Sequence, residues 1–300
     1  MPEIDLSLDA FESYIASVCT KQTAGRYRMA CGFFVEYLRD TGNTEFDKLP
    51  PNILMLWVQH LVQERHVAAR TVHLYVSGAR RYLRWVRQSG VPVPMLHEPD
   101  MPRVHHHIRP ILPPEYLQRY MDLASELFAD PICAAVQFLP SCGLRSSELV
   151  SLRLGEISRR KVVLRDGVAH DTFVLQLVGK GGYERIIPVL DDGKVFLTEY
   201  LTGWRRHRKG PWLFPMGKRG AKHVATRTIR HALEQMCEPL GRDFSPHTLR
   251  RTYAVRLWRR GVDATVIAKV LGHRSVATTY KHYLALQEDD ILKSVHGGGA

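Results

Sequence analysis

Several features common in membrane and secreted proteins are missing from this sequence. It has no run of about 18 apolar residues, and no N-terminal stretch in which basic residues precede an apolar segment. The five cysteines are odd in number, scattered along the chain and without a C-x-x-C pair, which favours free thiols over a disulfide framework. The sequence therefore argues against a membrane-spanning or disulfide-stabilised secreted protein, and we expect a cytoplasmic one.

Internal repeats and low-complexity stretches are also missing, and 300 residues are enough for two domains with separate cores. What the sequence has in excess is positive charge, with 42 Lys and Arg against 30 Asp and Glu and a net charge of +12. Residues 1–104 hold 12 basic and 11 acidic side chains, so nearly all of the excess lies after them. This charge favours a polyanionic partner, nucleic acid before an anionic membrane; a merely basic enzyme is the alternative.

The first 104 residues predict a small all-helical domain. Apolar residues at helical spacing predict helices at about 7–18, 27–38, 51–61 and 68–88. Prolines then recur from residue 90 to 114 and rule out a continuous helix, so residues 105–114 are expected to form a Pro-rich linker. His105, His106 and His107 lie in this linker, but consecutive side chains diverge and no acidic or cysteine partner is near, which argues against a metal site.

The helix predicted at 68–88 is rich in arginine. Candidate DNA contacts on it are Arg70, Arg80, Arg84 and Arg87, of which the last three are spaced to share a face. Arginines on one helix face can bind phosphates or guanine edges in a major groove. The alternative is an ordinary solvated face.

The remainder of the chain predicts an α+β domain. Helices are expected at about 114–129, 131–140, 191–208, 225–239, 247–259, 263–270 and 275–286. Strand-like runs occupy residues 162–164 and 173–178, and a third strand at 185–189 follows the glycine-rich turn at 179–182. The second domain should therefore combine many helices with a small sheet or hairpin.

Four short segments of this domain carry residues suited to chemistry. In chain order they are Cys142-Gly143-Leu144-Arg145-Ser146-Ser147-Glu148-Leu149, Gly179-Lys180-Gly181-Gly182-Tyr183-Glu184-Arg185, His247-Thr248-Leu249-Arg250, and Leu271-Gly272-His273 followed by Thr278-Thr279-Tyr280-Lys281-His282-Tyr283. Taken alone, each has a plain structural alternative. Arg145 and Glu148 fit a helical ion pair, and Lys180 fits an exposed turn.

Together, these side chains suit a phosphodiester. Two arginines can hold one phosphate through forked hydrogen bonds. A lysine can protonate a leaving oxygen, and two histidines can share proton transfer and hydrogen bonding to the phosphate. A tyrosine hydroxyl can attack phosphorus where surrounding positive charge lowers the cost of forming phenolate.

In this order the segments resemble the tyrosine recombinases, also called the phage integrase family. The matching patterns are Gly-Leu-Arg-x-Ser-Glu-Leu, Gly-Lys-Gly-x-x-x-Arg-x-x-Pro, His-x-Leu-Arg and Leu-Gly-His…Thr-Thr…Tyr. The resemblance implies a mainly α fold with a small β-sheet or hairpin. It implies a helical core-site DNA-binding domain at 1–104 and an α+β catalytic domain at 115–300 that ends in a docking tail. An additional N-terminal domain for arm-site binding is not expected.

The resemblance also implies roles in holding the phosphate. Arg145 and Arg250 would bind the scissile phosphate and stabilise its transition state, and Glu148 would support Arg145. The arginines would supply the charge that a metal ion otherwise supplies. Because a 3′-phosphotyrosyl link conserves the bond energy, ATP would not be needed either, and we expect neither a cofactor nor a metal.

Proton transfer would fall to the other matching residues. By resemblance, Lys180 would be the general acid for the 5′-hydroxyl leaving group, His247 would assist at the tyrosine, and His273 would hydrogen-bond a non-bridging oxygen. Two departures from the family pattern, Cys142 for threonine and Tyr183 for lysine, leave these residues in place.

The nucleophile is where the sequence departs most from the family. Tyr280 and Tyr283 follow His273 by seven and ten residues, whereas the usual spacing of nine falls on His282. Related integrases with Thr-Thr-x-x-x-Tyr have the tyrosine at ten, and one extra residue can be absorbed in the turn before the helix. A spacing of seven would pull the hydroxyl back along the helix by roughly 1.5 Å per residue. We therefore predict Tyr283 as the nucleophile and Tyr280 as a packing residue.

The function implied is conservative site-specific recombination for a mobile element, in a homotetramer on two double-stranded DNA sites. The apolar residues after Tyr283 would form the docking tail, with packing onto its own domain as the alternative. A type IB topoisomerase shares this chemistry, and a DNA-binding regulator without catalysis is a rival of another class. The helical first domain and the tail favour the recombinase over the topoisomerase, and the complete set of catalytic residues argues against the regulator.

Overall fold

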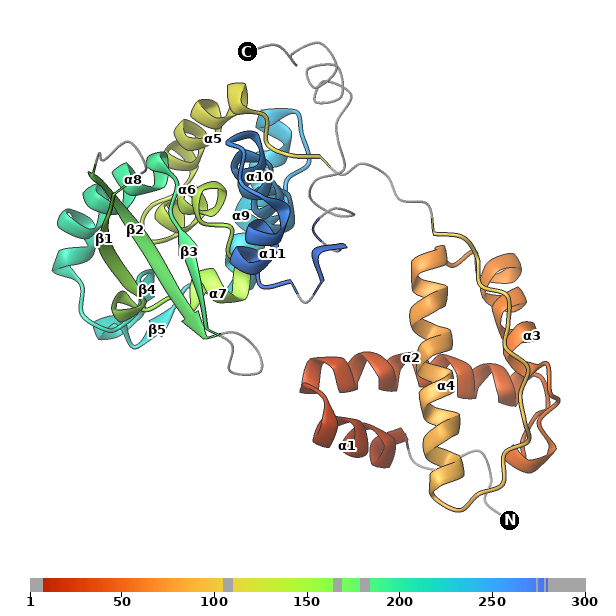
Figure 1. The fold of residues 1–300 in the computed structure, drawn as a ribbon. Coiled ribbons are helices and arrows are strands. Elements are labelled where there is room, and N and C mark those ends of the chain that lie inside the picture. Colours follow the sequence, from red (N-terminus) through yellow and green to blue (C-terminus); the bar gives the residue numbers. More distant parts are fainter. Residues whose placement is uncertain are drawn as a thin grey trace, which may run out of the picture. The chain divides into compact units, whose positions relative to one another are not determined.

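The computed structural model describes residues 8–104, 110–163, 169–178, 184–273, 275–277 and 279. The chain divides into two compact units, Met1–His106 and His107–Ala300 (Figure 1). Each unit has its own hydrophobic core. The expected fold class is confirmed, since helices dominate and a small sheet lies in the second unit. Within the described residues, no helix combines the length and apolar character needed to cross a membrane.

The described part of the first unit consists of helices, their connections and an extended segment after the last helix. Its elements are α1 (Leu8–Val18), α2 (Lys21–Asp40), η1 (Phe46–Lys48), α3 (Ile53–Gln59), the π-helical turn η2 (His60–Glu64) and α4 (Ala69–Gln88). Thr20 begins α2 because its hydroxyl accepts the Thr23 N–H at 3.3 Å. The apolar faces of these helices enclose a core that includes fully buried Phe11, Phe34 and Tyr82.

Helices α2 and α4 approach each other closely at a glycine. A Cβ added to Gly78 would lie 2.8 Å from the Cβ of Ala30, so a larger residue would push the two helices apart. The thiol of Cys31 donates to the Gly78 carbonyl at 3.3 Å across the same contact. This packing holds α4, the helix that carries Arg70, Arg80, Arg84 and Arg87, against α2.

The segment after α4 is extended and packs on the first unit. The His97 N–H donates to the Pro51 carbonyl at 2.7 Å, and His73 Nε2 lies 3.0 Å from the Pro102 carbonyl. Residues 110–112, by contrast, belong to the second unit: Leu112 N–H donates to the Thr252 hydroxyl at 2.8 Å, and Arg251 donates to the Pro110 carbonyl. Each end of the Pro-rich stretch is thus held by one unit.

The second unit is built around α6 (Ile132–Cys142), which is apolar on nearly all sides. Around it pack α5 (Pro114–Leu127), α8 (Asp191–Thr202), α9 (Thr226–Leu240) and α10 (Pro246–Arg259). A helix that is apolar all round must be buried on every side, and Ala135, Phe138 and Leu139 are fully buried here. The unit also contains the short helices α7 (Ser146–Val150), η3 (Leu154–Glu156) and α11 (Ala264–Leu271).

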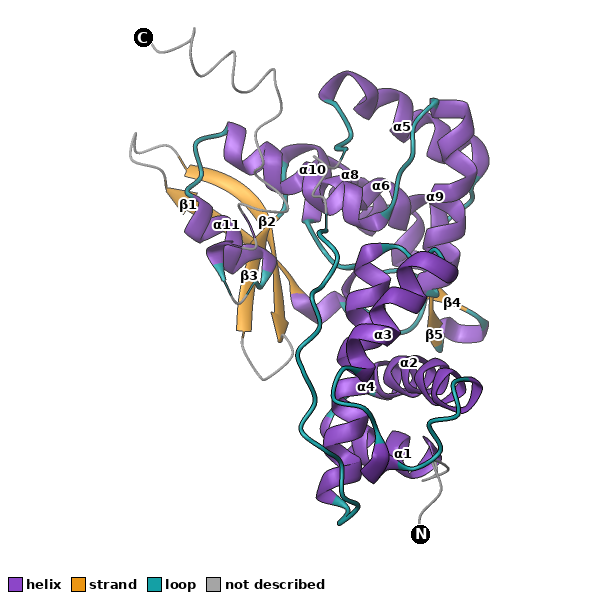
Figure 2. Cartoon of the chain, turned by 90° about the vertical axis from the view of Figure 1, so that its right-hand side faces the viewer, coloured by secondary structure: helices purple, strands orange, loops and turns teal. Residues whose placement is uncertain are grey.

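Strands β1 (Ile157–Val163), β2 (Ala169–Val178) and β3 (Glu184–Pro188) form an antiparallel sheet in chain order. Register partners include Leu175 with Ile187 and Val178 with Glu184. Figure 2 shows β3 beside α11, and the two elements are in contact. The sheet thereby brings β3 close to the helix that precedes His273.

Some predicted boundaries were wrong. Strand β1 begins at Ile157, before the predicted 162, because the exposed side chains of Arg159, Arg160 and Lys161 conceal the strand pattern. The helix predicted at 191–208 ends at Thr202, and a 3₁₀ turn, η4 (Trp204–His207), follows Gly203. The small pair β4 (Pro215–Met216) and β5 (Lys222–His223), with the turn η5 (Lys218–Gly220) between them, was not predicted. The helix predicted at 275–286 lies largely outside the described residues.

Candidate functional site

The site begins where α6 ends. Gly143 adopts a left-handed conformation (φ 58°), and a Cβ at this position would lie 2.3 Å from the ring of Tyr253. The chain therefore turns sharply at a glycine, and α7 begins directly after its N-cap residue, Arg145. The Glu148 carboxylate accepts the Arg145 N–H at 2.8 Å, so the Arg-x-x-Glu spacing caps this short helix and brings the two side chains together.

Glu148 is the centre of an arginine cluster that we call the Glu148 cluster: Arg145, Glu148, Arg185 and Arg250. Arg145 Nη1 donates to Glu148 Oε1 at 2.8 Å, and Arg185 Nη2 donates to Oε2 at 2.7 Å. Arg250 Nη1 lies 3.7 Å from the same Oε2. Three guanidinium groups share one carboxylate, which leaves the cluster with an excess of positive charge.

This environment holds Glu148 in its ionised form. Burial acts to raise the pKa of the Glu148 carboxyl, but hydrogen bonds from the Arg145 N–H and the Arg185 guanidinium outweigh it and leave the pKa below its ordinary value. The carboxylate is therefore a permanent acceptor for the arginines near neutral pH.

Arg250 is almost completely buried, with 1% of its side chain exposed. It lies in the first turns of α10, which Ser245 caps by accepting the Thr248 N–H at 3.2 Å. Its Nη1 donates to the Gly143 carbonyl at 2.8 Å, and its Nη2 donates to the Leu271 carbonyl. The planar fork of this arginine thus joins the turn before α7 to the C-terminal end of α11.

The end of α11 joins the same site. Gly272 adopts a left-handed conformation (φ 66°), and its carbonyl accepts a hydrogen bond from Arg145 Nη2 at 3.3 Å. His273 follows, with Nδ1 2.7 Å from the Thr279 hydroxyl and Nε2 3.5 Å from Arg250 Nη2. Two arginines thereby approach the negative end of one helix, which the helix dipole favours.

The structure brings together four of the residues singled out from the sequence: Arg145, Glu148, Arg250 and His273. His247 lies in the first turn of α10, three residues before Arg250, and its side chain is exposed. Lys180, Tyr280, His282 and Tyr283 lie outside the described residues, as do the predicted docking tail and His105–His107.

Two residues of the site were missed as site residues in the sequence. Arg185 occurs in the quoted Gly-Lys-Gly-x-x-x-Arg pattern, and its alternation with buried Ile187 on β3 was the available signal that it points inward. Thr279 occurs in the quoted Thr-Thr pair and is fully buried. Nothing in the local sequence indicates that its hydroxyl meets His273.

The candidate DNA contacts on α4 differ from one another. Arg70, Arg84 and Arg87 are exposed, and Arg87 Nη2 donates to the Pro94 carbonyl at 3.0 Å. Arg80 is partly buried and forms an ion pair with Glu98. Arg80 and Arg87 therefore hold the extended segment after α4, whereas Arg70 and Arg84 extend into solvent.

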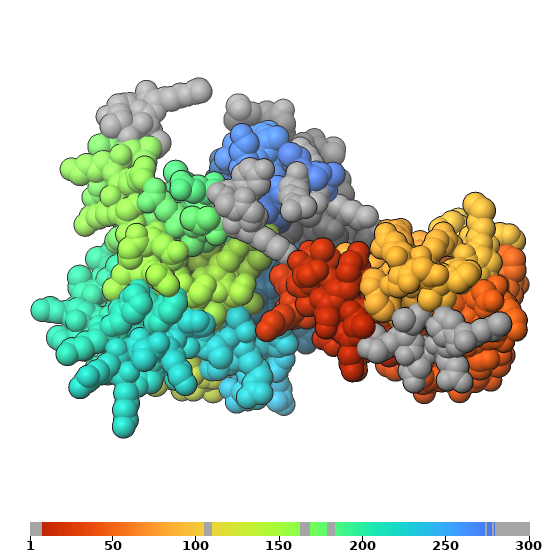
Figure 3. All heavy atoms as spheres, turned by 90° about the horizontal axis from the view of Figure 1, so that it is seen from below, coloured from red at the N-terminus to blue at the C-terminus, as the bar shows by residue number. Residues whose placement is uncertain are grey.

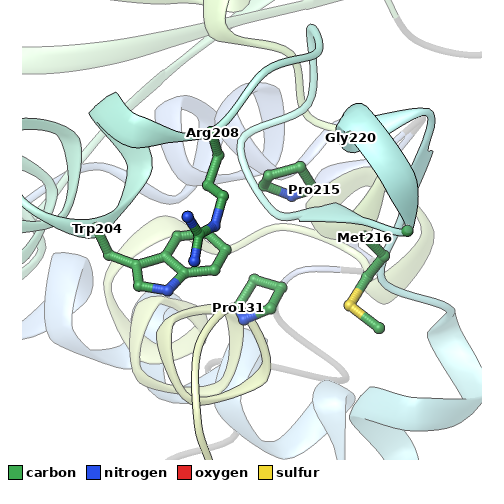
Figure 4. A pocket seen from close by; sticks show the side chains of 7 residues that line it. Pro131, Trp204, Arg208, Pro215, Met216 and Gly220 are labelled. Atoms are coloured by element: carbon green, nitrogen blue, oxygen red, sulfur yellow. The ribbon is translucent and has the colours of Figure 1, made fainter.

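The second unit also has a small pocket away from the candidate site. A pocket of about 210 Å³ is lined by Pro131, Trp204, Arg208, Pro215, Met216, Gly217 and Gly220, and includes none of the candidate site residues (Figure 4). The Arg208 guanidinium lies 4.7 Å from the centre of the Trp204 ring. The segment from α8 to α9, blue-green in Figure 3, is exposed on the side of the second unit seen there. Among the described residues, no group of three or more His, Cys, Asp or Glu is placed to bind a metal ion.

Comparison with known sequences places this arrangement in a family. Residues 112–289 match the sequence profile of the phage integrase family. A tyrosine recombinase XerD of Pseudomonas putida is 29% identical over 295 residues, which covers 94% of this chain and 92% of that protein. A tyrosine recombinase of Thermosipho africanus is 26% identical over 303 residues, covering 97% of this chain and 100% of that protein.

Solved structures share the fold. The XerH site-specific recombinase bound to palindromic difH substrate in a post-cleavage complex superposes with a TM-score of 0.68 at 17% identity, covering 95% of this chain and 83% of that one. A lambda integrase dimer bound to a COC′ core site gives a TM-score of 0.66 at 16% identity, covering 93% and 95%.

Proposed function

This chain belongs to the phage integrase family and is a site-specific tyrosine recombinase, and we propose that it cleaves and rejoins double-stranded DNA through a 3′-phosphotyrosyl link on Tyr283. The observation that carries the proposal is the Glu148 cluster. Its members come from residues up to 105 positions apart in sequence, yet their guanidinium groups converge on one carboxylate beside His273. A cationic cluster of this kind suits a phosphate whose negative charge grows in the transition state.

In the proposed reaction, the Tyr283 oxygen bonds to phosphorus as the bond to the 5′-oxygen breaks. His247 takes the tyrosine proton, and Lys180 donates a proton to the departing 5′-oxygen. Arg145 and Arg250 stabilise the phosphate, and His273 hydrogen-bonds a non-bridging oxygen. Rejoining reverses these transfers, with a 5′-hydroxyl attacking the phosphotyrosyl link.

The solved relatives bound to DNA support DNA as the partner. We propose that the first unit binds the core site, with Arg70 and Arg84 as phosphate contacts, and that the reaction takes place in a tetramer on two sites. We further propose that the residues after Tyr283 dock on a neighbouring protomer. Truncation before Gln287 should then leave DNA binding by a single protomer intact but weaken synapsis.

The test of the nucleophile is covalent capture on a nicked suicide substrate. Wild-type protein and Tyr280→Phe should form a covalent protein–DNA complex, whereas Tyr283→Phe should bind the DNA without forming one. Mass spectrometry of the trapped peptide locates the adduct. An adduct in Tyr283→Phe, or one found on Tyr280, would contradict the assignment.

A second measurement separates recombination from related activities. Incubation with two target sites should give exchanged DNA ends, as expected for relatives that are recombinases. Relaxation of supercoiled DNA without exchange would instead indicate a topoisomerase, and binding without covalent capture would indicate a regulator. Capture should proceed in excess chelator, because the arginines carry the charge that a metal ion would otherwise supply.

A further inference from the structure

One buried cation of the site has no role in the proposed reaction. Arg185 is the second residue of β3, two positions after the 179–183 segment that contains Lys180, and only 9% of its side chain is exposed. Burying a guanidinium is costly unless it is paired. Its partners should therefore reveal what this side chain does.

The hydrogen bond to Glu148 is the main polar contact of Arg185. Its Nη2 donates to Glu148 Oε2 at 2.7 Å, while its Nε is buried and makes no hydrogen bond to any residue that the structure describes. The position of the guanidinium therefore depends on this one carboxylate. In turn, Arg185 is one of the groups that hold Oε2, which also accepts the Arg145 N–H and lies 3.7 Å from Arg250 Nη1.

The two oxygens of Glu148 accept hydrogen bonds from different donors, and this arrangement orients Arg145. With Oε2 held by Arg185 and the Arg145 N–H, Oε1 remains to receive Arg145 Nη1 at 2.8 Å. A carboxylate that lost Arg185 could rotate about its terminal torsion, which is a soft one. Arg145, with 40% of its side chain exposed, would then lose its fixed direction.

Arg185 also sets the approach of α11 to the cluster. A Cβ at Gly272 would lie 2.5 Å from Arg185 Nη1, so the guanidinium packs directly against the backbone that leads into His273. The carbonyl of this same Gly272 accepts the hydrogen bond from Arg145 Nη2. One side chain thus contacts both structures that orient Arg145.

We propose that Arg185 is a positioning residue that acts through Glu148 and Gly272 to hold Arg145 in the geometry required for phosphate transfer. The inference rests on the proposed function and deepens it. Because Arg185 acts on orientation, its loss should slow phosphate transfer by about 100-fold, the order expected from displacing a reacting group by about 1 Å. DNA affinity should change little, since most phosphate contacts remain.

Arg185 follows the segment that contains Lys180 closely in sequence, so an alternative role for Arg185 would be to position Lys180, the general acid. The two roles separate on a substrate whose 5′-bridging oxygen is replaced by sulfur, because a thiolate leaves without needing a proton. Lys180→Ala should recover cleavage on this substrate. Arg185→Ala should remain slow, since the phosphate is still poorly held.

The experiment measures single-turnover covalent capture at saturating DNA, DNA affinity by anisotropy, and thermal stability. Its variants are Arg185→Ala, Arg185→Lys and Glu148→Gln, with the Arg185→Ala/Glu148→Gln double variant. Arg185→Lys should recover part of the rate, and the double variant should be no slower than the slower single one, because both act through the same contact. Arg159→Ala is the matched control: its pair with Asp171, at 2.9 Å, lies on the same sheet away from the cluster.

Four results would overturn the inference. Arg185→Ala could capture DNA at the wild-type rate, or could recover the full rate on the sulfur substrate. The rate of capture in the double variant could fall by the product of the two single losses, or Arg159→Ala could lose as much rate as Arg185→Ala. Should Arg185→Ala fail to fold, the same substrate comparison is made with Arg185→Lys. Absence of capture by the wild-type protein would instead contradict the proposed function, so the two failures are distinguishable.

Discussion

The arginines of the two units are held in different ways. Those of the Glu148 cluster donate hydrogen bonds to a carboxylate or to the carbonyls of Gly143, Leu271 and Gly272. On α4, Arg70 and Arg84 are exposed, and each can reorient at little cost. A reaction at one phosphorus atom requires donors that are already oriented, whereas binding along a DNA backbone tolerates donors that adjust. The comparison predicts large effects on rate in the cluster and small effects on affinity in α4.

The largest effect should come from Arg250→Lys. A lysine cannot reach the Gly143 and Leu271 carbonyls with one planar fork, so the phosphate site loses its geometry, and covalent capture should slow by about 1,000-fold. The control is Arg256→Lys on the same helix, where the arginine binds both oxygens of Asp192 at 2.8 and 3.0 Å. Equal losses in the two variants would mean that α10 packing, rather than the phosphate site, is responsible.

Glu148→Gln tests whether the cluster depends on its carboxylate. Removing the charge leaves buried guanidinium groups without their counter-ion, so the free energy of unfolding should fall by about 3 kcal/mol near neutral pH. Because the pKa of Glu148 is depressed on folding, this stabilisation is present above the ordinary value of 4.5 and is lost as the pH falls through the lower folded-state pKa. Urea unfolding of both proteins should therefore converge in acid.

The matched control for this measurement is Glu156→Gln. Glu156 accepts the Arg153 N–H at 2.7 Å, as Glu148 accepts that of Arg145, but it has no described contact with a buried arginine. The free energy of unfolding should fall much less in Glu156→Gln, because no buried arginine loses its counter-ion. A pH-independent loss in Glu148→Gln would remove the electrostatic explanation.

Thr279→Val tests the orientation of His273. The variant keeps the shape of the side chain but loses the hydroxyl that lies 2.7 Å from Nδ1, so the ring is no longer held in one tautomer and direction. A hydrogen bond worth about 1 kcal/mol corresponds to a rate of capture lower by about fivefold. Thr279→Ser, which retains the hydroxyl, should stay close to wild type; an equal loss in both would point to packing.

The smallest effects are expected on α4. Arg70→Ala and Arg84→Ala should each lower the slope of log affinity against log salt concentration by about 1, while capture at saturating DNA is unchanged. Arg28, whose guanidinium already pairs with Asp9 and Glu12, provides the control substitution. Unaltered salt slopes would remove these two arginines from the proposed DNA-binding surface.

Most of the fold was predictable because the apolar periodicity of a helix is visible within a short stretch of sequence. The apolar spacing that predicted helices near 7–18 and 68–88 reflects the faces that α1 and α4 bury. The start of strand β1 was predicted too late, at 162 instead of Ile157, because the exposed charged side chains of Arg159, Arg160 and Lys161 give no apolar signal for a strand. The same limit applies to Arg80, whose partner Glu98 lies on a segment without regular structure.

The order and spacing of the motifs, the family, and the turn that brings Arg145 to Glu148, three residues apart, can all be read from the amino acids alone. The contact of Arg185 with this carboxylate, the hydrogen bond from Arg145 to Gly272, 127 positions later, and the approach of the Thr279 hydroxyl to His273 became visible only in the folded chain. Helical periodicity and capping act over a few residues, whereas a buried arginine finds its partners only after separate helices have packed around α6 and brought their ends together.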